Sequence, residues 1–326
     1  GSYCWGIFSD KYGRRIGYTA TSAFTGLFGL LSAFSPNYIF VLLSRFLVGF
    51  GLGGAPVAFS LFSEYVPTAK RGFYLLIFEL FWTVGTLLEA GLAWMLLPPL
   101  GWRWLLGASA LPSLVLALLF PVIPESARFL VVAGKKDRAI RELRRISRQN
   151  AISLPRGELV DKSSNQARGK IKDMFRAPFT KTTFLLWFCW FGSAFVYYGL
   201  VLLTTEVYRL ENPTSEDGNV PCKDLWTTDD YVGIFVTTFA ELPGLLIAAA
   251  MVNRLGRRMT QGLQFFVVFA ACGILMISMP RIVEDVFFFA ARAFIMGAFS
   301  TIYVYTPEVF SRLCTLHAFT SPVSGC

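Results

Sequence analysis

Long apolar blocks separated by short polar turns dominate this chain of 326 residues. Eight blocks hold about 18 or more largely apolar residues, enough for a helix to cross a bilayer core roughly 30 Å thick. They are too long, and alternate too little, to be barrel strands. The pattern therefore predicts eight complete membrane-spanning helices. These spans are 16–34, 38–60, 72–97, 103–123, 182–205, 230–252, 259–279 and 286–306, and residues 1–8 form the end of one more.

The longest polar segment, residues 124–181, separates two groups of spans. Within it, residues 135–149 predict an amphipathic helix with Lys and Arg on its polar side. Its apolar stripe consists of Ala139, Ile140, Leu143 and Ile146. Two interpretations fit: a helix packed beneath the bundle, or a helix lying against anionic lipid headgroups.

A short basic turn occurs twice. Gly13-Arg14-Arg15 is repeated as Gly256-Arg257-Arg258, 243 positions later. Repeated halves built from spans are typical of transporters with a shared site near the membrane midplane. We therefore divide the chain into a first half bundle, a central cytoplasmic loop, a second half bundle and an atypical polar tail. Their limits are 1–123, 124–181, 182–310 and 311–326.

The composition agrees with an all-α polytopic membrane protein. Hydrophobic residues make up 54% and charged residues only 16%, whereas a soluble domain carries about 25% charged residues. The net charge of +9 does not indicate nucleic-acid binding, because most of the 30 Lys and Arg fall in alternate loops. This asymmetry predicts that residues 10–15 and the central loop are cytoplasmic.

The chain lacks the sequence patterns of common active sites. Its six Cys have no CxxC spacing, and no triad or metal-ligand spacing is visible. The glycines at 49–54 do not form a dinucleotide fingerprint, and we assign them to close helix packing. We therefore expect no enzyme activity, no metal and no cofactor.

Three further motifs accompany the basic turn at residues 6–15. They are the glycine-rich stretch after Arg45 (45–54), the stretch from Glu64 that includes Arg71 (64–72), and Pro-Glu-Ser-Ala-Arg-Phe-Leu (124–130). Together these motifs resemble the major facilitator superfamily in its sugar-porter and organic-ion branch. Residues 190–199 and 305–310 further resemble plant organic cation/carnitine transporters, niacin transporters and synaptic vesicle 2-related proteins.

The resemblance implies a gating charge network at the cytoplasmic mouth. Opposite charges there can pair in one conformation and separate in another. Asp10 is implied to lock the two halves against span 11, while Asn253 takes the place of the acid in the second copy. The alternative is a cluster that only sets topology. The network residues are Asp10, Arg14, Arg15, Glu64, Arg71, Glu125, Arg128, Arg257, Arg258 and Glu308.

Several polar and aromatic residues within spans are candidates for a substrate or proton pathway. A charge as deep as Arg45 costs at least ~2.5 kcal/mol unless it is paired or hydrated, so we expect it to face a cavity. The resemblance implies an acidic partner on span 1 and proton coupling. Arg292 begins its span and is expected to snorkel. The candidates are Arg45, Glu79, Glu241, Trp190, Tyr197 and Tyr198.

Each candidate has a purely structural alternative. Glu241 precedes Pro243-Gly244, where a helix can kink. It and Glu79 are candidate proton or cation sites, but a glutamate can also simply hydrogen-bond between helices. Aromatic side chains can stack on a pyridine or cover an ammonium group, yet they also fill cores and interface belts.

The expected function is secondary transport of a small organic ion by alternating access, linked to protons. By resemblance the substrate is nicotinate or a carnitine-like cation. When the spans are numbered as in the family that the chain resembles, we expect span 1 and spans 11–12 to be missing. The alternative is therefore a non-transporting binding or regulatory protein, or an inactive truncated isoform. The expected location is the plasma membrane or a vacuolar or vesicle membrane.

Overall fold

The computed structural model describes residues 1–326 with gaps. The gaps are 68–70, 155–156, 158, 160–174, 176–178, 212–227, 278–279 and 321–326, and only the backbone is described for 208–211 and 310–320. The regular structure of the described residues is helical and contains no strand. This agrees with the all-α class predicted from the apolar blocks.

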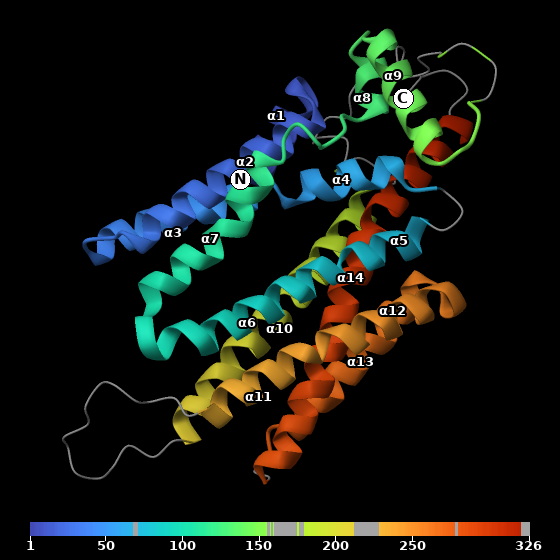
Figure 1. The fold of residues 1–326 in the computed structure, drawn as a ribbon. Helices are drawn as coiled ribbons and strands as arrows, with labels where there is room; N and C mark the ends of the chain where they lie inside the picture. The colour runs from blue at the N-terminus through green and yellow to red at the C-terminus, as the bar shows by residue number, and fades with distance from the viewer. Residues whose placement is uncertain are drawn as a thin grey trace. The chain divides into compact units, whose positions relative to one another are not determined.

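Each predicted span coincides with one helix or with two consecutive helices (Figure 1). The helices of the spans are α2 (Arg14–Ala33), α3 (Tyr38–Leu52), α4 (Ala55–Tyr65), α5 (Arg71–Phe78), α6 (Leu80–Leu100), α7 (Trp102–Leu118), α10 (Phe179–Glu211), α11 (Thr228–Phe239), α12 (Glu241–Leu255), α13 (Arg257–Ile274) and α14 (Arg281–Thr320). The remaining helices are α1 (Ser2–Tyr12), α8 (Ala127–Val132) and α9 (Lys136–Gln149).

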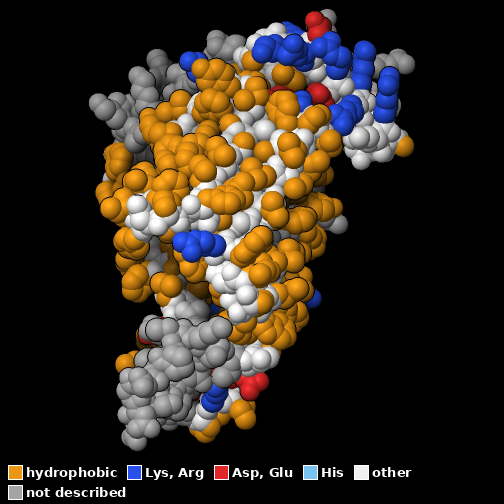
Figure 2. Space-filling view, turned by 60° about the vertical axis from the view of Figure 1, so that its left-hand side comes forward, with side chains coloured by type: hydrophobic (Ala, Val, Ile, Leu, Met, Phe, Trp, Pro, Cys, Tyr) orange, Lys and Arg blue, Asp and Glu red, His pale blue; other side chains and the backbone are white. Residues whose placement is uncertain are grey.

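By length and composition, four helical stretches among the described residues can cross a membrane. They are Tyr38–Tyr65, Arg71–Leu100, Phe179–Val207 and Thr228–Leu255. This is half the number predicted. The helix α7 is apolar but shorter, with 17 residues, and α2 and α13 begin with two arginines and carry further polar residues. Figure 2 shows hydrophobic side chains over most of the visible face, as a lipid-facing surface requires.

The chain forms two compact units. The first holds residues 1–71 and 95–166, and the second holds 72–94 and 167–326. This differs from the sequential division at residue 123, because α5 and most of α6 group with the later helices. Side chains of α6 also form hydrogen bonds with side chains of α10 and α12, as described below.

In the first unit, α2 packs against α3 and α7, while α1 packs against α2 and α4. The predicted amphipathic helix at 135–149 is present as α9, and it packs on α8. Much of the remaining central loop lies outside the described residues. The predicted tail at 311–326 is helical up to Thr320.

In the second unit, α14 packs against α10, α11, α12 and α13. Its buried core includes Leu200, Val268, Phe288, Ile295 and Met296. The helices α12 and α14 cross closely, since a Cβ added at Gly244 would lie 2.0 Å from the Ala293 carbonyl oxygen. Glycine at this position lets the two backbones meet, and it fixes the distance between the side chains that α12 and α14 carry.

Three spans are each divided into two helices in the described part of the chain. The break between α3 and α4 falls at Gly53-Gly54, that between α5 and α6 at Glu79, and that between α11 and α12 at Ala240. The last break comes directly before Glu241 and Pro243, where the sequence predicted a kink. Two of the three breaks therefore lie at or beside a glutamate.

Candidate functional site

A buried ion pair joins α12 to α14 in the second unit. Arg292 Nη2 lies 2.9 Å from Glu241 Oε1, and the two side chains are 6% and 0% exposed. The expectation that Arg292 snorkels to the interface is therefore wrong. The side chain remains inside the unit because Glu241 is close enough to neutralise it.

Two more helices contribute to the surroundings of Glu241. The Tyr197 hydroxyl on α10 donates to Glu241 Oε1 over 3.1 Å, and Thr86 Oγ1 on α6 donates to Oε2 over 3.3 Å. The indole N–H of Trp82 in turn donates to the Tyr197 oxygen over 3.0 Å. Side chains from α6, α10, α12 and α14 thus meet at one carboxylate.

This centre is electrically balanced but not fully satisfied. One negative and one positive charge face each other, which removes most of the cost of placing either in an apolar environment. Arg292 Nε is nevertheless buried with no hydrogen-bond partner among the described residues. This N–H group has lost its hydration without gaining a hydrogen bond. The uncompensated cost favours a rearrangement in which Arg292 Nε finds a partner.

An aromatic cluster lies between α10 and α14 beside the ion pair. The Trp190 ring meets Tyr303 edge-on with centroids 4.6 Å apart, and its N–H donates to Thr306 Oγ1 over 3.0 Å. Phe299 bridges Trp190 and Tyr197, at 5.8 Å and 5.5 Å. Tyr197 is buried, whereas the adjacent Tyr198 is half exposed.

Glu79 is the second buried carboxylate of this unit. It occupies the break between α5 and α6 and is 9% exposed. Among the described residues it has no ion pair and no side-chain hydrogen bond, although it lies close enough to Tyr303 for an electrostatic interaction. Unlike Glu241, it is a buried acid that has no cation as an ion-pair partner in the described part of the chain.

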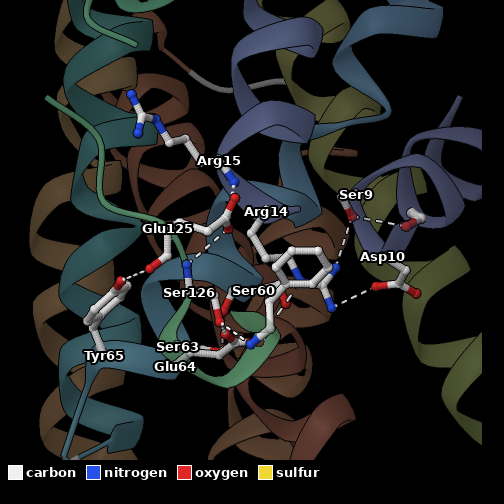
Figure 3. A network of polar contacts seen from close by, with 12 residues as sticks. Ser9, Asp10, Arg14, Arg15, Ser60, Ser63, Glu64, Tyr65, Glu125 and Ser126 are labelled. Carbon is white, nitrogen blue, oxygen red and sulfur yellow. Dashed lines mark hydrogen bonds and ion pairs between the residues drawn. The ribbon is translucent and has the colours of Figure 1, made fainter. Parts of the chain in front are cut away.

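The first unit carries the predicted charge network where α1 meets α2 (Figure 3). Arg14 pairs with Asp10 at 2.8 Å and lies 3.9 Å from Glu64 on α4. Glu64 also accepts a hydrogen bond from the Ser126 hydroxyl. That hydroxyl caps α8 by accepting from the Phe129 N–H over 3.0 Å.

Glu125 connects the same network to the start of α2. Its Oε1 accepts from the backbone N–H of Arg15 over 3.1 Å, and its carbonyl oxygen accepts from the Tyr65 hydroxyl over 2.5 Å. The Arg15 guanidinium donates to the Phe120 carbonyl oxygen. Gly13 has φ of 114°, and a Cβ there would lie 2.3 Å from Glu125 Oε2. Glycine is thus required both for the turn and for the approach of the carboxylate.

The second basic turn repeats this arrangement. Gly256 has a positive φ of 78°, and Arg257 follows it as the first residue of α13, just as Arg14 follows Gly13. Arg257 Nη2 lies 2.9 Å from Glu308 on α14. Each turn therefore places its first arginine near a glutamate located about 50 residues downstream.

Other predicted site residues are not brought together. Arg45, Arg128 and Arg258 are exposed. Arg71, on α5, is half buried and is likewise without a carboxylate within 4 Å among the described residues. Glu64 approaches Arg14 rather than Arg71, and Glu125 contacts Arg15 rather than Arg128. A group of three or more metal-ligating side chains is also absent from the described part of the chain.

Sequence reasoning missed three members of the buried centre: Trp82, Thr86 and Arg292. A signal for the first two exists. Glu79, Trp82, Thr83 and Thr86 follow the i, i+3, i+4, i+7 spacing of one helix face within an otherwise apolar span. Such a stripe on a span predicts a face turned toward protein rather than lipid.

Comparison with known protein families and structures identifies what this chain is similar to. The family described as "Sugar (and other) transporter" matches residues 1–314. The xylose transporter XylE from E. coli, in a partially occluded inward open conformation, has a similar fold. The TM-score is 0.62 at 17% identity, covering 96% of this chain and 72% of that one.

Closer relatives are found by sequence. The synaptic vesicle 2-related protein of Xenopus laevis is 43% identical over 318 residues, covering 95% of this chain and 58% of the relative. Organic cation/carnitine transporter 7 of Arabidopsis thaliana is 38% identical over 351 residues, covering 95% and 69%. The putative transporter svop-1 of Caenorhabditis elegans is 38% identical, covering 94% and 60%. The chain thus spans between about half and about two thirds of the length of these relatives.

Proposed function

Because the chain belongs to the sugar and other transporter family of the major facilitator superfamily, we propose that it carries a small organic cation across a membrane by alternating access. The observation that carries this proposal is the buried carboxylate of Glu79, which forms no ion pair with any residue that the structure describes. A membrane protein that buries an acid in this way favours a positively charged ligand at that position.

The contrast between the two buried acids supports a cation at Glu79 rather than at Glu241. Glu241 already faces Arg292 at 2.9 Å, so a cationic substrate there would have to displace a guanidinium group. Glu79 has no such competitor among the described residues. The binding of a cation would therefore neutralise Glu79 without breaking an existing ion pair.

The aromatic cluster supports an organic cation in particular. Tyr303 lies close enough to Glu79 and Tyr198 for electrostatic interactions, and the Trp190 ring meets it edge-on. An ammonium group over the face of an aromatic ring gains about 0.5–2 kcal/mol. A quaternary ammonium group has no N–H and gains little from hydrogen bonding. Rings and one carboxylate are the partners that suit it best.

We also propose that transport is linked to protons through Glu241. A proton that binds the Glu241 carboxylate removes its charge and leaves Arg292 without a counter-ion. Since an isolated buried charge is costly, protonation would favour a conformation in which Arg292 reaches water or another anion. The hydrogen bond from Tyr197 to Glu241 then couples this change to α10, which also carries Trp190.

The two basic turns supply the gate in this proposal. The Arg14–Glu64 and Arg257–Glu308 pairs occupy equivalent positions at the predicted cytoplasmic ends of the two units. A pair at the protein surface contributes only about 0–1 kcal/mol, and these pairs are partly buried. A few such pairs suffice to bias two conformations that differ by a few kcal/mol.

Two alternatives lead to different outcomes. Nicotinate, an anion, would use the exposed Arg45 rather than Glu79. A non-transporting binding or regulatory protein would bind the cation but not move it. The membrane in which the protein acts is the plasma membrane or, as the name of the vesicle-related relatives suggests, a vesicle or vacuolar membrane.

The experiment is uptake into proteoliposomes that contain the full chain. Labelled carnitine, tetraethylammonium and nicotinate are compared, with and without an imposed pH gradient. We expect uptake of the two ammonium compounds that the gradient stimulates and that Glu79→Gln abolishes. Uptake of nicotinate alone, with loss in Arg45→Ala, would overturn the cation proposal. No uptake of any solute despite binding would favour the non-transporting alternative.

A further inference from the structure

A basic helix at the end of the first unit carries charge that the proposed transport site does not use. The helix α9 and the Lys135 before it hold seven Lys and Arg against two acids, Asp137 and Glu142. Figure 1 labels α8 and α9, and Figure 2 shows Lys and Arg side chains gathered on one part of the visible surface. The two faces of α9 have different surroundings.

The apolar stripe of α9 is already covered by protein. Ala139 is fully buried, and Ile140, Leu143 and Ile146 are half buried, because the helix packs on α8. This stripe is therefore not free to insert into a membrane. The contact fixes the direction in which the opposite face of the helix points.

The opposite face is a row of four arginines. Arg141, Arg144, Arg145 and Arg148 follow the i, i+3, i+4, i+7 spacing, and all four are exposed. Together with Gln149 they line a hollow of about 430 Å³. Among the described residues, none of the four has a carboxylate within 4 Å. Four uncompensated guanidinium groups in one hollow suit phosphate oxygens, which they can bind in pairs.

The position of the helix points to a membrane surface. It packs on α8, whose first turn is capped by Ser126 within the charge network at the predicted cytoplasmic ends of the spans. The cytoplasmic leaflet holds the anionic phospholipids of a cell membrane. Two exposed apolar side chains flank α9 in the chain: Val132, the last residue of α8, is 50% exposed, and Ile152, just after α9, is 68% exposed. The backbone N–H of Ile152 donates to the Ser147 carbonyl oxygen.

We propose that the arginine face of α9 binds the headgroup of an anionic phospholipid of the cytoplasmic leaflet. The four guanidinium groups hold the phosphate oxygens, while Val132 and Ile152 contact the acyl region beside them. Basic residues near an anionic surface each add to the attraction. The site is separate from the cation centre of the second unit and does not depend on transport.

The test is equilibrium binding of short-chain lipids to the purified full chain in a non-ionic detergent. The probes are dioctanoyl phosphatidylserine and dioctanoyl phosphatidylinositol 4-phosphate, with dioctanoyl phosphatidylcholine as the neutral control. Free inositol 1,4-bisphosphate stands for a soluble phosphate ligand, and a poly-glutamate peptide stands for an acidic protein partner. The double variant Arg144→Gln/Arg148→Gln is compared with Lys135→Gln/Lys136→Gln, which removes the same charge from the other side and start of the helix.

We expect both anionic lipids to bind and phosphatidylcholine not to bind. Because two surface charges contribute about tenfold or more in affinity, Arg144→Gln/Arg148→Gln should weaken binding at least tenfold and the lysine variant less than threefold. An equal loss in both variants would overturn the proposal in favour of unspecific attraction. Equal or tighter binding of the free inositol phosphate or of poly-glutamate would overturn it in favour of those ligands, as would the absence of any lipid binding.

Discussion

Tyr197 donates its hydroxyl hydrogen bond to Oε1 of Glu241, the same oxygen that contacts Arg292. The Trp82 indole N–H in turn donates to the Tyr197 oxygen. The hydrogen bonds therefore run in one direction, from the indole through the phenol to the carboxylate. Hydrogen bonds in such a chain polarise one another. A change in the charge of Glu241 therefore alters the contacts that it makes with α6, α10 and α14.

Substitutions of Glu241 and Arg292 should have strongly non-additive effects on the free energy of unfolding. Glu241→Gln or Arg292→Gln alone should lower the free energy of unfolding by about 3–5 kcal/mol, because each leaves one buried charge without a partner. The double variant should recover most of that loss, since neither charge remains. Thermal unfolding of the purified chain in detergent measures all three variants. A double variant as unstable as the sum of the two single variants would show that the two side chains do not interact.

Removal of one hydroxyl tests the hydrogen-bond chain without changing charge. Tyr197→Phe should lower stability by about 1–3 kcal/mol, because the Trp82 N–H then has no acceptor and Glu241 loses a donor. The neighbouring Tyr198→Phe is the matched control. Its ring is half exposed, and we expect a change below about 0.5 kcal/mol. Similar effects of the two substitutions on the unfolding midpoint would contradict the assigned network.

Alanine substitutions in the two basic turns distinguish the cost of backbone strain from the cost of a steric clash with Glu125. Gly13→Ala and Gly256→Ala both place a Cβ on a backbone with positive φ and extended ψ, which costs about 1–3 kcal/mol. Only at Gly13 does the new atom also meet the Glu125 carboxylate, at 2.3 Å; at Gly256 it meets nothing within 4 Å. Unfolding midpoints should therefore fall further for Gly13→Ala. A larger fall for Gly256→Ala would argue against the role given to Glu125.

Much of the fold follows from local pattern. Long apolar blocks predicted the positions of the helices, because hydrophobic length and backbone satisfaction act within one segment. The repeated basic turn falls where α2 and α13 begin, each after a glycine with positive φ. Pro243 predicted the interruption beside Glu241.

The pairing of charges did not follow from local pattern. The partner of Glu241 lies 51 positions away in the chain, and the side chain that approaches Glu64 comes from α2 rather than from the adjacent Arg71. The hydrogen bonds of Trp82 and Thr86 with α10 and α12 likewise join segments far apart in the chain. Contacts of this kind are set by how helices cross, which spacing along one helix does not specify.

The central claim is that Glu79 binds an organic cation, and equilibrium binding of labelled tetraethylammonium to the purified full chain tests it most directly. Glu89→Gln provides a control, because it removes an exposed acid ten residues further along the same span. We predict that the unmodified chain and Glu89→Gln bind the cation in a one-to-one ratio, and that Glu79→Gln weakens binding at least tenfold. Undiminished binding by Glu79→Gln, or no binding by the unmodified chain, would contradict the account.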